Sequence, residues 1–287
     1  MRTPPRAEAE RLASRLPPLL VAAERVASIV AQGVHGRRRV GIGESFWQFR
    51  HYRPGDPIRQ IDWRQSAKGD DILFREQEWE AAQSVWLWCD RSLSMGFRSD
   101  RKLSEKGETA ALLTLALSSL LVRAGERITF YGTGLRPQGG RLAIDAVMRA
   151  LSEPQDELLP EQVLPRHARI VLISDWLMDT DLIAQRLRSL SAEGLRGHVV
   201  MISDPAELSL PYNGRVRFEG LEDEGDVVIS NVAAARSDYR KLIDAHHDWL
   251  AGEVQRLNWV FCHHVSNEPP ERALLALYAA MADLEKS

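Results

Sequence analysis

Long apolar runs, paired cysteines and a strong net charge are all lacking in this sequence of 287 residues. No stretch reaches the roughly 18 to 20 consecutive apolar residues that a membrane-spanning helix needs, and the first residues show no signal-peptide pattern. We therefore expect a cytoplasmic protein. The two cysteines, Cys89 and Cys262, fall in strand-like runs, which indicates reduced core thiols and argues against a disulfide framework.

Sequence motifs of common enzyme classes are lacking as well. There is no Gly-x-Ser-x-Gly nucleophile elbow, no His-Glu-x-x-His and no Cys-x-x-Cys. The glycines and arginines of residues 36–43 do not form a phosphate-binding loop, because no Gly-Lys-Ser/Thr follows them and no strand precedes them. Nothing pairs a nucleophile with its base, so we do not expect an enzyme. A metal-dependent hydrolase that uses Ser94 or a metal-bound water is kept as an alternative.

The charge is unevenly distributed along an otherwise ordinary globular composition of 44% hydrophobic and 27% charged residues. Residues 1–75 carry 14 Lys and Arg against 8 Asp and Glu, whereas the whole chain has a net charge of −3. The first quarter is therefore basic and the remainder acidic. A basic arm is typical of nucleic-acid binding, which we keep as a second alternative. Because acids alternate with these arginines, internal ion pairing or docking on the acidic remainder is favoured.

The N-terminal part, residues 1–79, is predicted to hold one helix and an irregular segment that packs on the main domain. Residues 1–16 are expected to be a poorly ordered lead, and apolar residues at helical spacing predict a helix over residues 17–32. Pro54 and Gly55 predict a type II turn. The rings and guanidiniums around this turn form either a structural Arg/Asp network, which we favour, or a partner-binding surface. The residues concerned are Arg50, Arg53, Asp56, Arg59, Asp62 and Trp63.

Residues 80–287 are predicted to form the main domain, with an α/β fold. Short apolar runs alternate with segments of helical periodicity, which favours right-handed crossovers and a doubly wound, mostly parallel sheet of the Rossmann type. Two alternating runs, residues 214–219 and 226–230, predict an antiparallel hairpin at the edge of this sheet. The predicted strands are residues 85–89, 127–131, 168–174, 198–203 and 257–265, and the predicted helices are residues 104–123, 142–151, 181–192, 232–256 and 269–285.

The first predicted strand of this domain ends in Asp90-x-Ser92-x-Ser94, a carboxylate and two hydroxyls at alternating positions. Such oxygens suit a hard cation such as Mg²⁺. An aspartate that caps a turn and serines that fill it would give the same sequence pattern. The third predicted strand also ends in a hydroxyl and a carboxylate, Ser174 and Asp175. Ligands bind beyond the carboxyl ends of parallel strands, so if these two strands are neighbours, the oxygens converge in one crevice.

These oxygen residues resemble the metal-ion-dependent adhesion site of von Willebrand factor A domains, with Asp175 at the place of that family's later-loop aspartate. A longer set of sequence motifs resembles the bacterial proteins known as domain of unknown function 58. It comprises Gly43-Glu44-x-Phe46, Arg50-x-Tyr52-x-Pro54-Gly55-Asp56, Arg59-x-Ile61-Asp62-Trp63 and Asp204-Pro205-x-Glu207. The resemblance covers roughly Arg37 to the C-terminus. It implies a von Willebrand A-like domain, no established enzymatic activity and frequent pairing with MoxR-type AAA+ ATPases.

One position departs from the adhesion-site pattern. That site takes a threonine after a Gly-Gly-like turn, whereas here Arg141 follows the two glycines. Thr133 is the nearby hydroxyl, although it comes soon after its strand. The resemblance leaves two possibilities open. Either Mg²⁺ is bound by Asp90, Ser92, Ser94 and Asp175, with Thr133 as a further ligand, or the site is vestigial and Arg141 pairs with Asp90 or Asp175.

The function expected from these features is that of a non-enzymatic protein–protein interaction module. It would act with a MoxR-type AAA+ ATPase in the assembly or maturation of a client protein. In the metal-bound version, a Glu or Asp of the partner would complete the Mg²⁺ shell.

Overall fold

The computed structural model describes residues 5–35, 46–52, 61–69, 71–77, 83–153, 159–221 and 225–283. The chain divides into two compact units, of which the larger combines Met1–Gln32 with Gln83–Ser287 and the smaller is Gly33–Ala82. This division differs from the expected boundary between residues 79 and 80. The physical reason is that the N-terminal helix groups with the main domain and not with the arginine-rich segment.

Helix α1 (Pro5–His35) begins well before the expected residue 17, so the expected poorly ordered lead is wrong from Pro5 onward. Its first turns are rich in Ala, Glu, Arg and Leu, which are strong helix formers, and Pro17 and Pro18 lie inside the helix. A buried apolar stripe along α1 attaches it to the larger unit. The stripe consists of Leu16, Ala23, Val26, Ala27 and Val30.

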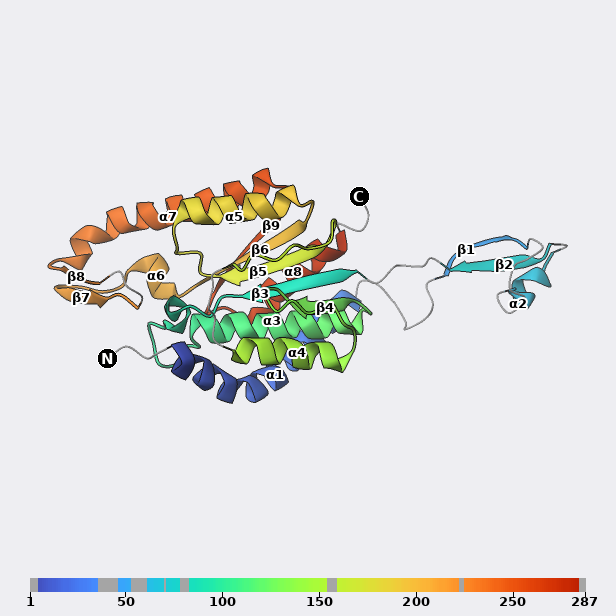
Figure 1. Ribbon diagram of the computed structural model, residues 1–287, viewed down its shortest axis with the longest axis horizontal. Helices are drawn as coiled ribbons and strands as arrows, with labels where there is room; N and C mark the ends of the chain where they lie inside the picture. The colour runs from blue at the N-terminus through green and yellow to red at the C-terminus, as the bar shows by residue number, and fades with distance from the viewer. Residues whose placement is uncertain are drawn as a thin grey trace. The chain divides into compact units, whose positions relative to one another are not determined.

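Five parallel strands form the sheet of the larger unit, in the order β4-β3-β5-β6-β9 (Figure 1). This confirms the predicted α/β class with a doubly wound, mostly parallel sheet. Strands β3 and β5 are neighbours although β4 comes between them in the sequence, so the direction of travel across the sheet reverses at this pair. Open α/β sheets bind ligands at such a switch point. The strand bounds are β3 Ser84–Cys89, β4 Arg127–Phe130, β5 Arg169–Ser174, β6 Arg196–Ser203 and β9 Val260–Val265.

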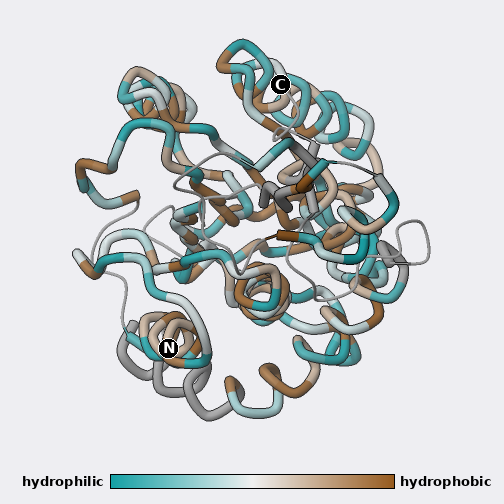
Figure 2. The backbone as a smooth tube through the Cα atoms, turned by 90° about the vertical axis from the view of Figure 1, so that its right-hand side faces the viewer, coloured by the Kyte–Doolittle hydropathy of each residue, from teal (hydrophilic) through white to brown (hydrophobic). Residues whose placement is uncertain are grey.

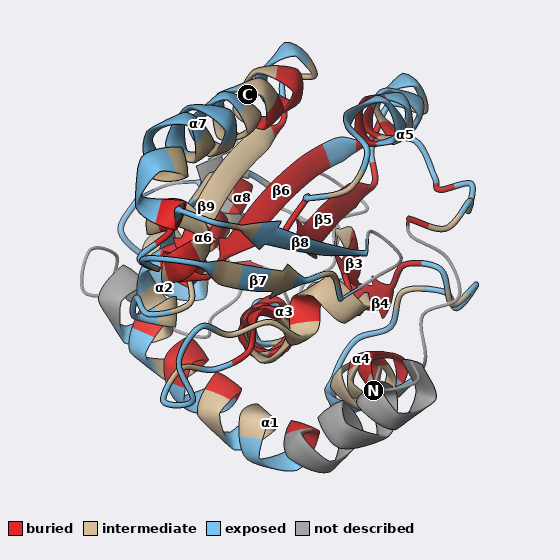
Figure 3. Cartoon of the chain, turned by 90° about the vertical axis from the view of Figure 1, so that its left-hand side faces the viewer, coloured by how far each residue is buried: buried red, intermediate tan, exposed pale blue. Residues whose placement is uncertain are grey.

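Helices cover both faces of the sheet, as a doubly wound fold requires. Helices α5 (Thr180–Ala192) and α7 (Val232–Arg256) lie on one face, and α3 (Lys106–Arg123) and α4 (Arg141–Ser152) lie on the other (Figures 1 and 3). Helix α8 (Pro270–Asp283) packs on the same side as α3. Because α3 and α5 follow the two strands of the switch point onto opposite faces, the loops that lead into them diverge and leave space between them.

The hydrophobic core lies in the middle strands of the sheet and on the sides of the helices that face them (Figure 2). All six residues of β5 are buried, as is β3 after its first residue, which matches the short apolar runs of the sequence. Cys89 is buried, Cys262 is partly buried, and both thiols are free, as expected. In the part of the chain that the structure describes, no helix has the length and apolar character needed to cross a membrane.

The hairpin of β7 (Val216–Glu219) and β8 (Asp226–Ile229) is antiparallel, as predicted, but its predicted place at the sheet edge is wrong. It forms a separate two-stranded sheet, and Figure 3 shows it in front of the carboxyl ends of the main strands. The short helix α6 (Pro205–Ser209), which was not expected, lies beside it. Among the described strands, the hairpin pairs only with itself, and its residues 216–221 and Ile229 line a cavity at this place.

The smaller unit pairs β1 (Phe46–His51) with β2 (Leu73–Gln77) in an antiparallel hairpin. Between them lies the single-turn helix α2 (Trp63–Ser66). Asp62 caps this helix, because its carboxylate accepts hydrogen bonds from the backbone N–H groups of Arg64 and Gln65. The expected type II turn at residues 54 and 55 falls outside the described residues.

Candidate functional site

Two loops meet at the carboxyl ends of β3 and β5. Because Cys89 is in register with Ile173 in these adjacent parallel strands, Asp90 and Ser174 follow at the same end. The Ser174 hydroxyl donates a hydrogen bond of 2.7 Å to Asp90 Oδ2, which joins the two strand ends directly. The convergence expected for neighbouring strands is therefore present in the fold.

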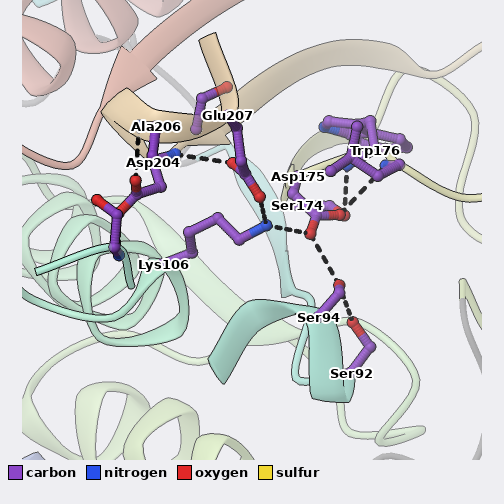
Figure 4. A network of polar contacts seen from close by, with 12 residues as sticks. Ser92, Ser94, Lys106, Ser174, Asp175, Trp176, Asp204, Ala206 and Glu207 are labelled. Carbon is purple, nitrogen blue, oxygen red and sulfur yellow. Dashed lines mark hydrogen bonds and ion pairs between the residues drawn. The ribbon is translucent and has the colours of Figure 1, made fainter. Parts of the chain in front are cut away.

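The two serines of the first loop extend this contact toward the second loop (Figure 4). The hydroxyl oxygens of Ser92 and Ser94 lie 3.1 Å apart, and the Ser94 hydroxyl donates to Asp175 Oδ2 at 2.8 Å. Asp90 Oδ1 accepts a hydrogen bond of 2.8 Å from the backbone N–H of Ser92. Asp90 thus caps its own turn, as the plainer interpretation predicts, while its second oxygen accepts from Ser174.

A strained residue holds Asp175 in place. Trp176 follows it with a φ of 56°, in the left-handed region that bulky residues rarely occupy. Its backbone N–H donates to the Ser174 hydroxyl at 3.0 Å, and its indole N–H donates to the carbonyl of Val200 at 2.9 Å. The fully buried ring also packs against Trp88, with centroids 6.3 Å apart. These contacts offset the strain and fix the direction of the Asp175 carboxylate.

Lys106 completes the polar network, and sequence reasoning missed it. Its ammonium lies 2.7 Å from Asp175 Oδ2 and 2.5 Å from Glu207 Oε1 (Figure 4). The side chain is 1% exposed, which is rare for a lysine and requires paired acids. One buried cation therefore bridges the loop after β5 and helix α6.

The local structure explains how a lysine reaches this position. Lys106 is the first residue of α3, where the helix dipole disfavours a cation, and a capping box between Glu105 and Glu108 stabilises this helix end. The next residue is Gly107, at which a Cβ would lie 3.2 Å from the carbonyl oxygen of Met95. The glycine lets α3 begin close to the loop that carries Ser92 and Ser94. A lysine against the dipole, directly before a glycine, is the sequence signal that could have indicated a tertiary acid partner.

Helix α6 supplies the third carboxylate of the network. Asp204 caps this helix through the backbone N–H of Ala206, while Glu207 Oε2 accepts from the backbone N–H of Asp204 at 2.8 Å. The other oxygen of Asp204 accepts from the backbone N–H of Ser99 at 2.9 Å, which ties α6 to the loop before α3. The Asp204-Pro205-x-Glu207 motif therefore forms a capped turn that places Glu207 next to Lys106.

The charges of this network perturb one another. Burial alone would lower the pKa of Lys106, but the carboxylates of Asp175 and Glu207 raise it above its usual value, so the lysine stays charged. Burial raises the pKa of Glu207, and Lys106 offsets part of this effect. The pKa of Asp90 is raised first by burial and then by the charge of Asp175. The Lys106 ammonium is thus paired with two of the three carboxyl groups of the network, those of Asp175 and Glu207.

This network opens into a cavity of about 590 Å³, a volume suited to a peptide segment or small ligand. Its polar lining includes Asp90, Ser92, Ser94, Lys106, Asp175 and Glu207, together with Arg217 and Glu219 of the hairpin. Its apolar and aromatic lining consists mainly of Phe97, Leu177, Leu210, Tyr212, Phe218, Ile229 and Tyr239. The Tyr239 hydroxyl donates to the backbone carbonyl of Glu207 at 2.7 Å, which attaches this wall to the network.

Two residues weighed for this site lie elsewhere. Thr133 does not line the cavity, and its hydroxyl donates to the carbonyl of Phe130 at 2.8 Å within its own turn. Arg141 is the exposed first residue of α4, and among the described residues it makes no ion pair with Asp90 or Asp175. The pairing of Arg141 with Asp90 or Asp175, one of the two possibilities left open by the sequence, is therefore not the arrangement in the structure. Its physical reason is that the buried Lys106 already occupies the position of the cation.

The residues expected to bind a partner or clamp the N-terminal segment belong to the smaller unit. Asp62 caps α2, and Trp63 in that helix is 61% exposed. Arg50 lies in β1, in register with Phe74. Arg53, Asp56 and Arg59 fall outside the described residues.

The network was expected to suit Mg²⁺, which prefers oxygen ligands in octahedral geometry. The hydroxyls and carboxylates are suitable oxygens, but each already has a hydrogen-bond partner in the protein. The ammonium of Lys106 has no lone pair for a metal, and it supplies positive charge at Asp175. Within the described ranges, no group of three or more His, Cys, Asp or Glu residues is placed to hold a metal ion. With Lys106 in place, these residues do not fit a divalent ion.

Fold and site together define a doubly wound α/β domain with a ligand-sized cavity at its switch point. The model of the family described as Protein of unknown function DUF58 matches residues 48–248. The chain belongs to this family.

Relatives and solved structures with similarity to the chain cover most of its length. Uncharacterized proteins of Mycobacterium bovis and Mycobacterium tuberculosis are each 26% identical over 265 residues, covering 85% of this chain and 82% of theirs. The crystal structure of an aerotolerance-related membrane protein from Bacteroides fragilis is 18% identical, with a TM-score of 0.41 over 70% of this chain and 100% of that one. The conserved hypothetical protein BatB from Bacteroides thetaiotaomicron is 13% identical, with a TM-score of 0.39 over the same shares.

Proposed function

We propose that this protein is a non-enzymatic interaction module of von Willebrand A-like architecture that holds a segment of a partner protein in the cavity at the switch point. The observation that carries this proposal is the joining of two kinds of lining in one cavity. A largely buried, hydrogen-bonded polar network lies on one side, and aromatic and aliphatic side chains from α6, α7 and the β7–β8 hairpin lie on the other. Apolar walls with a few fixed polar groups are typical of recognition sites.

The partner proposed for this cavity is a MoxR-type AAA+ ATPase, with which the protein would act in the assembly or maturation of a client. The chain's resemblance to a family that is frequently paired with such ATPases supports this choice. The geometry supports a protein segment as ligand, because exposed apolar side chains lie on the hairpin that lines the cavity. Leu221 lines the cavity itself, and Val227 and Val228 are exposed in β8 next to the lining residue Ile229.

A hydrolase is not favoured by the arrangement of the network. The Ser94 hydroxyl donates to Asp175 Oδ2, and the same oxygen accepts from Lys106, so this carboxylate is a poor base for activating the serine. No histidine is among the described residues that line the cavity. Nucleic-acid binding would involve residues 37–64, which belong to the smaller unit. The cavity of the larger unit has more acidic than basic lining residues, so it does not favour a nucleic acid as ligand.

Calorimetric titration of the full chain with the MoxR-type ATPase of the same organism tests the proposal. We expect Phe218→Ala, in the hairpin outside the main sheet, to weaken binding about tenfold or more, because buried aromatic anchors dominate interface energies. Leu142→Ala is the matched control, since Leu142 is 72% exposed on α4 and away from the cavity. Equal affinities for Phe218→Ala and the wild type would place the interface elsewhere, and no binding by the wild type would reject this partner.

A further inference from the structure

Three carboxyl groups meet at the cavity from three different loops. Asp90 follows β3, Asp175 follows β5, and Glu207 lies in the helix after β6. Asp90 and Asp175 are 1% and 2% exposed, so bulk water screens their repulsion weakly. A fold that brings such loops together needs a cation at their meeting point.

We propose that the Lys106 ammonium is this cation: it permanently takes the electrostatic place of a divalent ion, so the site is assembled without metal and does not bind Mg²⁺ or Mn²⁺ while Lys106 is present. This inference concerns how the site is built, and it holds whichever partner the cavity accepts.

The contacts of the ammonium support this assignment. It lies 2.7 Å from Asp175 Oδ2 and 2.5 Å from Glu207 Oε1, so it donates charge-assisted hydrogen bonds to both carboxylates. Asp175 Oδ2 also accepts from Ser94 at 2.8 Å, so both of its lone pairs have donors. A divalent ion ligated by this oxygen would have to displace the ammonium or the hydroxyl.

The position of the lysine in the chain makes it a fixed component. Lys106 begins α3, and the close approach of Gly107 to Met95 holds this helix end against the loop that carries the serines. The side chain is almost fully buried. If the ammonium moved out into water, the carboxylates of Asp175 and Glu207 would lose their counter-charge. A bound metal exchanges with solvent, whereas this cation is part of the fold.

An ammonium in the place of a metal ion changes what the site can recognise. An open metal site, as expected from the sequence, keeps coordination positions for a partner's carboxylate. An ammonium has three donors, and two of them already bind Asp175 and Glu207. Recognition at this cavity therefore depends on its aromatic and aliphatic walls and not on completing a metal shell.

Thermal unfolding and Mn²⁺ electron paramagnetic resonance on the full chain test the proposal, with the metal salts alone as probes. We expect the wild-type midpoint to be the same in EDTA, millimolar Mg²⁺ and millimolar Mn²⁺, with no bound Mn²⁺ signal. We expect Lys106→Ala to unfold at a lower temperature and to gain a few degrees with Mn²⁺, because Asp175 and Glu207 then lose their cation beside Asp90 and the two serines. Lys241→Ala, an exposed lysine on α7 paired with Asp238, is the control and should show neither effect.

The wild-type measurement decides the proposal even where Lys106→Ala does not fold. Saturable Mn²⁺ or Mg²⁺ binding by the wild type that is lost in Asp90→Asn would overturn it. Lys106→Arg, which keeps the charge, should remain as insensitive to metal as the wild type. If Lys106→Ala folds but gains no stability from Mn²⁺, the ammonium is not standing in for a divalent ion. These readouts do not involve the ATPase, so they stand apart from the test of the proposed function.

Discussion

The two ends of the same parallel sheet use charge in opposite ways. At the carboxyl end, the ammonium of Lys106 is in direct contact with two acids inside a network of hydroxyls. At the amino end, three arginines line a second cavity of about 400 Å³, and one of them, Arg169, donates a hydrogen bond of 2.7 Å to the carbonyl of Met281 in α8. The described contacts of the first end join loops to one another, and those of the second end join a strand to a helix.

The topology accounts for this difference. At the carboxyl end the chain leaves the strands and enters helices by their N-termini, so acidic residues such as Glu207 are stabilised there by the helix dipole. Lys106 is the exception, a cation at a helix N-terminus, and its two acid partners offset its cost. A residue at a position that its local structure disfavours indicates that tertiary contacts stabilise it there. For Lys106 these contacts are those of the candidate site.

The largest predicted effect comes from breaking the network at the carboxyl end. We expect Lys106→Met to reduce the free energy of unfolding by about 3 to 5 kcal/mol, because it leaves Asp175 and Glu207 buried without a counter-charge. Arg166→Met, at the exposed rim of the amino-end cavity, should change it by less than about 0.5 kcal/mol. Urea unfolding followed by circular dichroism measures both. Similar losses for the two variants would show that the ends do not differ in this way.

A smaller effect is predicted for acid, and it originates away from the carboxyl-end network. Burial, and then the Arg169 guanidinium, lower the pKa of the His198 imidazole from 6.5 to about 4. As the pH falls from about 6.5 to 4, the unfolded chain takes up a proton that the folded chain cannot accept. The free energy of unfolding should therefore fall by up to about 3 kcal/mol over this window. Asp90 and Glu207 work in the opposite direction, because their pKa values are raised and protonation favours the folded state.

Denaturant unfolding at a series of pH values between 7 and 4 tests this assignment. His198→Leu should lose a substantial part of the acid sensitivity, while His263, whose pKa is lowered to about 4 first by burial and then by His247, retains its own share. His51→Leu is the control, because His51 is an exposed residue of the smaller unit. An unchanged pH profile in His198→Leu would assign the acid sensitivity to other groups.

Much of the fold and half of the site could be predicted from the sequence. The strands are short apolar runs, and parallel neighbours must bring Asp90 and Asp175 to one edge. Lys106 could not be placed in this way, since its partner Glu207 is 101 positions away, and a lysine at a helix N-terminus before a glycine indicates an acid partner without saying which one. The hairpin was predictable from its alternation, but alternation does not say against which surface a two-stranded ribbon packs.

The smallest predicted effect sharpens the contrast between the cation that was expected from the sequence and the one in the structure. Arg141→Ala should change the free energy of unfolding by less than about 0.5 kcal/mol, because Arg141 is exposed at the start of α4 and substitutions at such positions rarely cost more. The measurement is the same urea titration, with Lys106→Met as the reference variant. A loss for Arg141→Ala as large as that for Lys106→Met would mean that the arginine reaches the carboxylates in solution, and the lysine would then share its role. A null result for Arg141, together with a large loss for Lys106, would leave the buried lysine as the cation on which the carboxyl end depends.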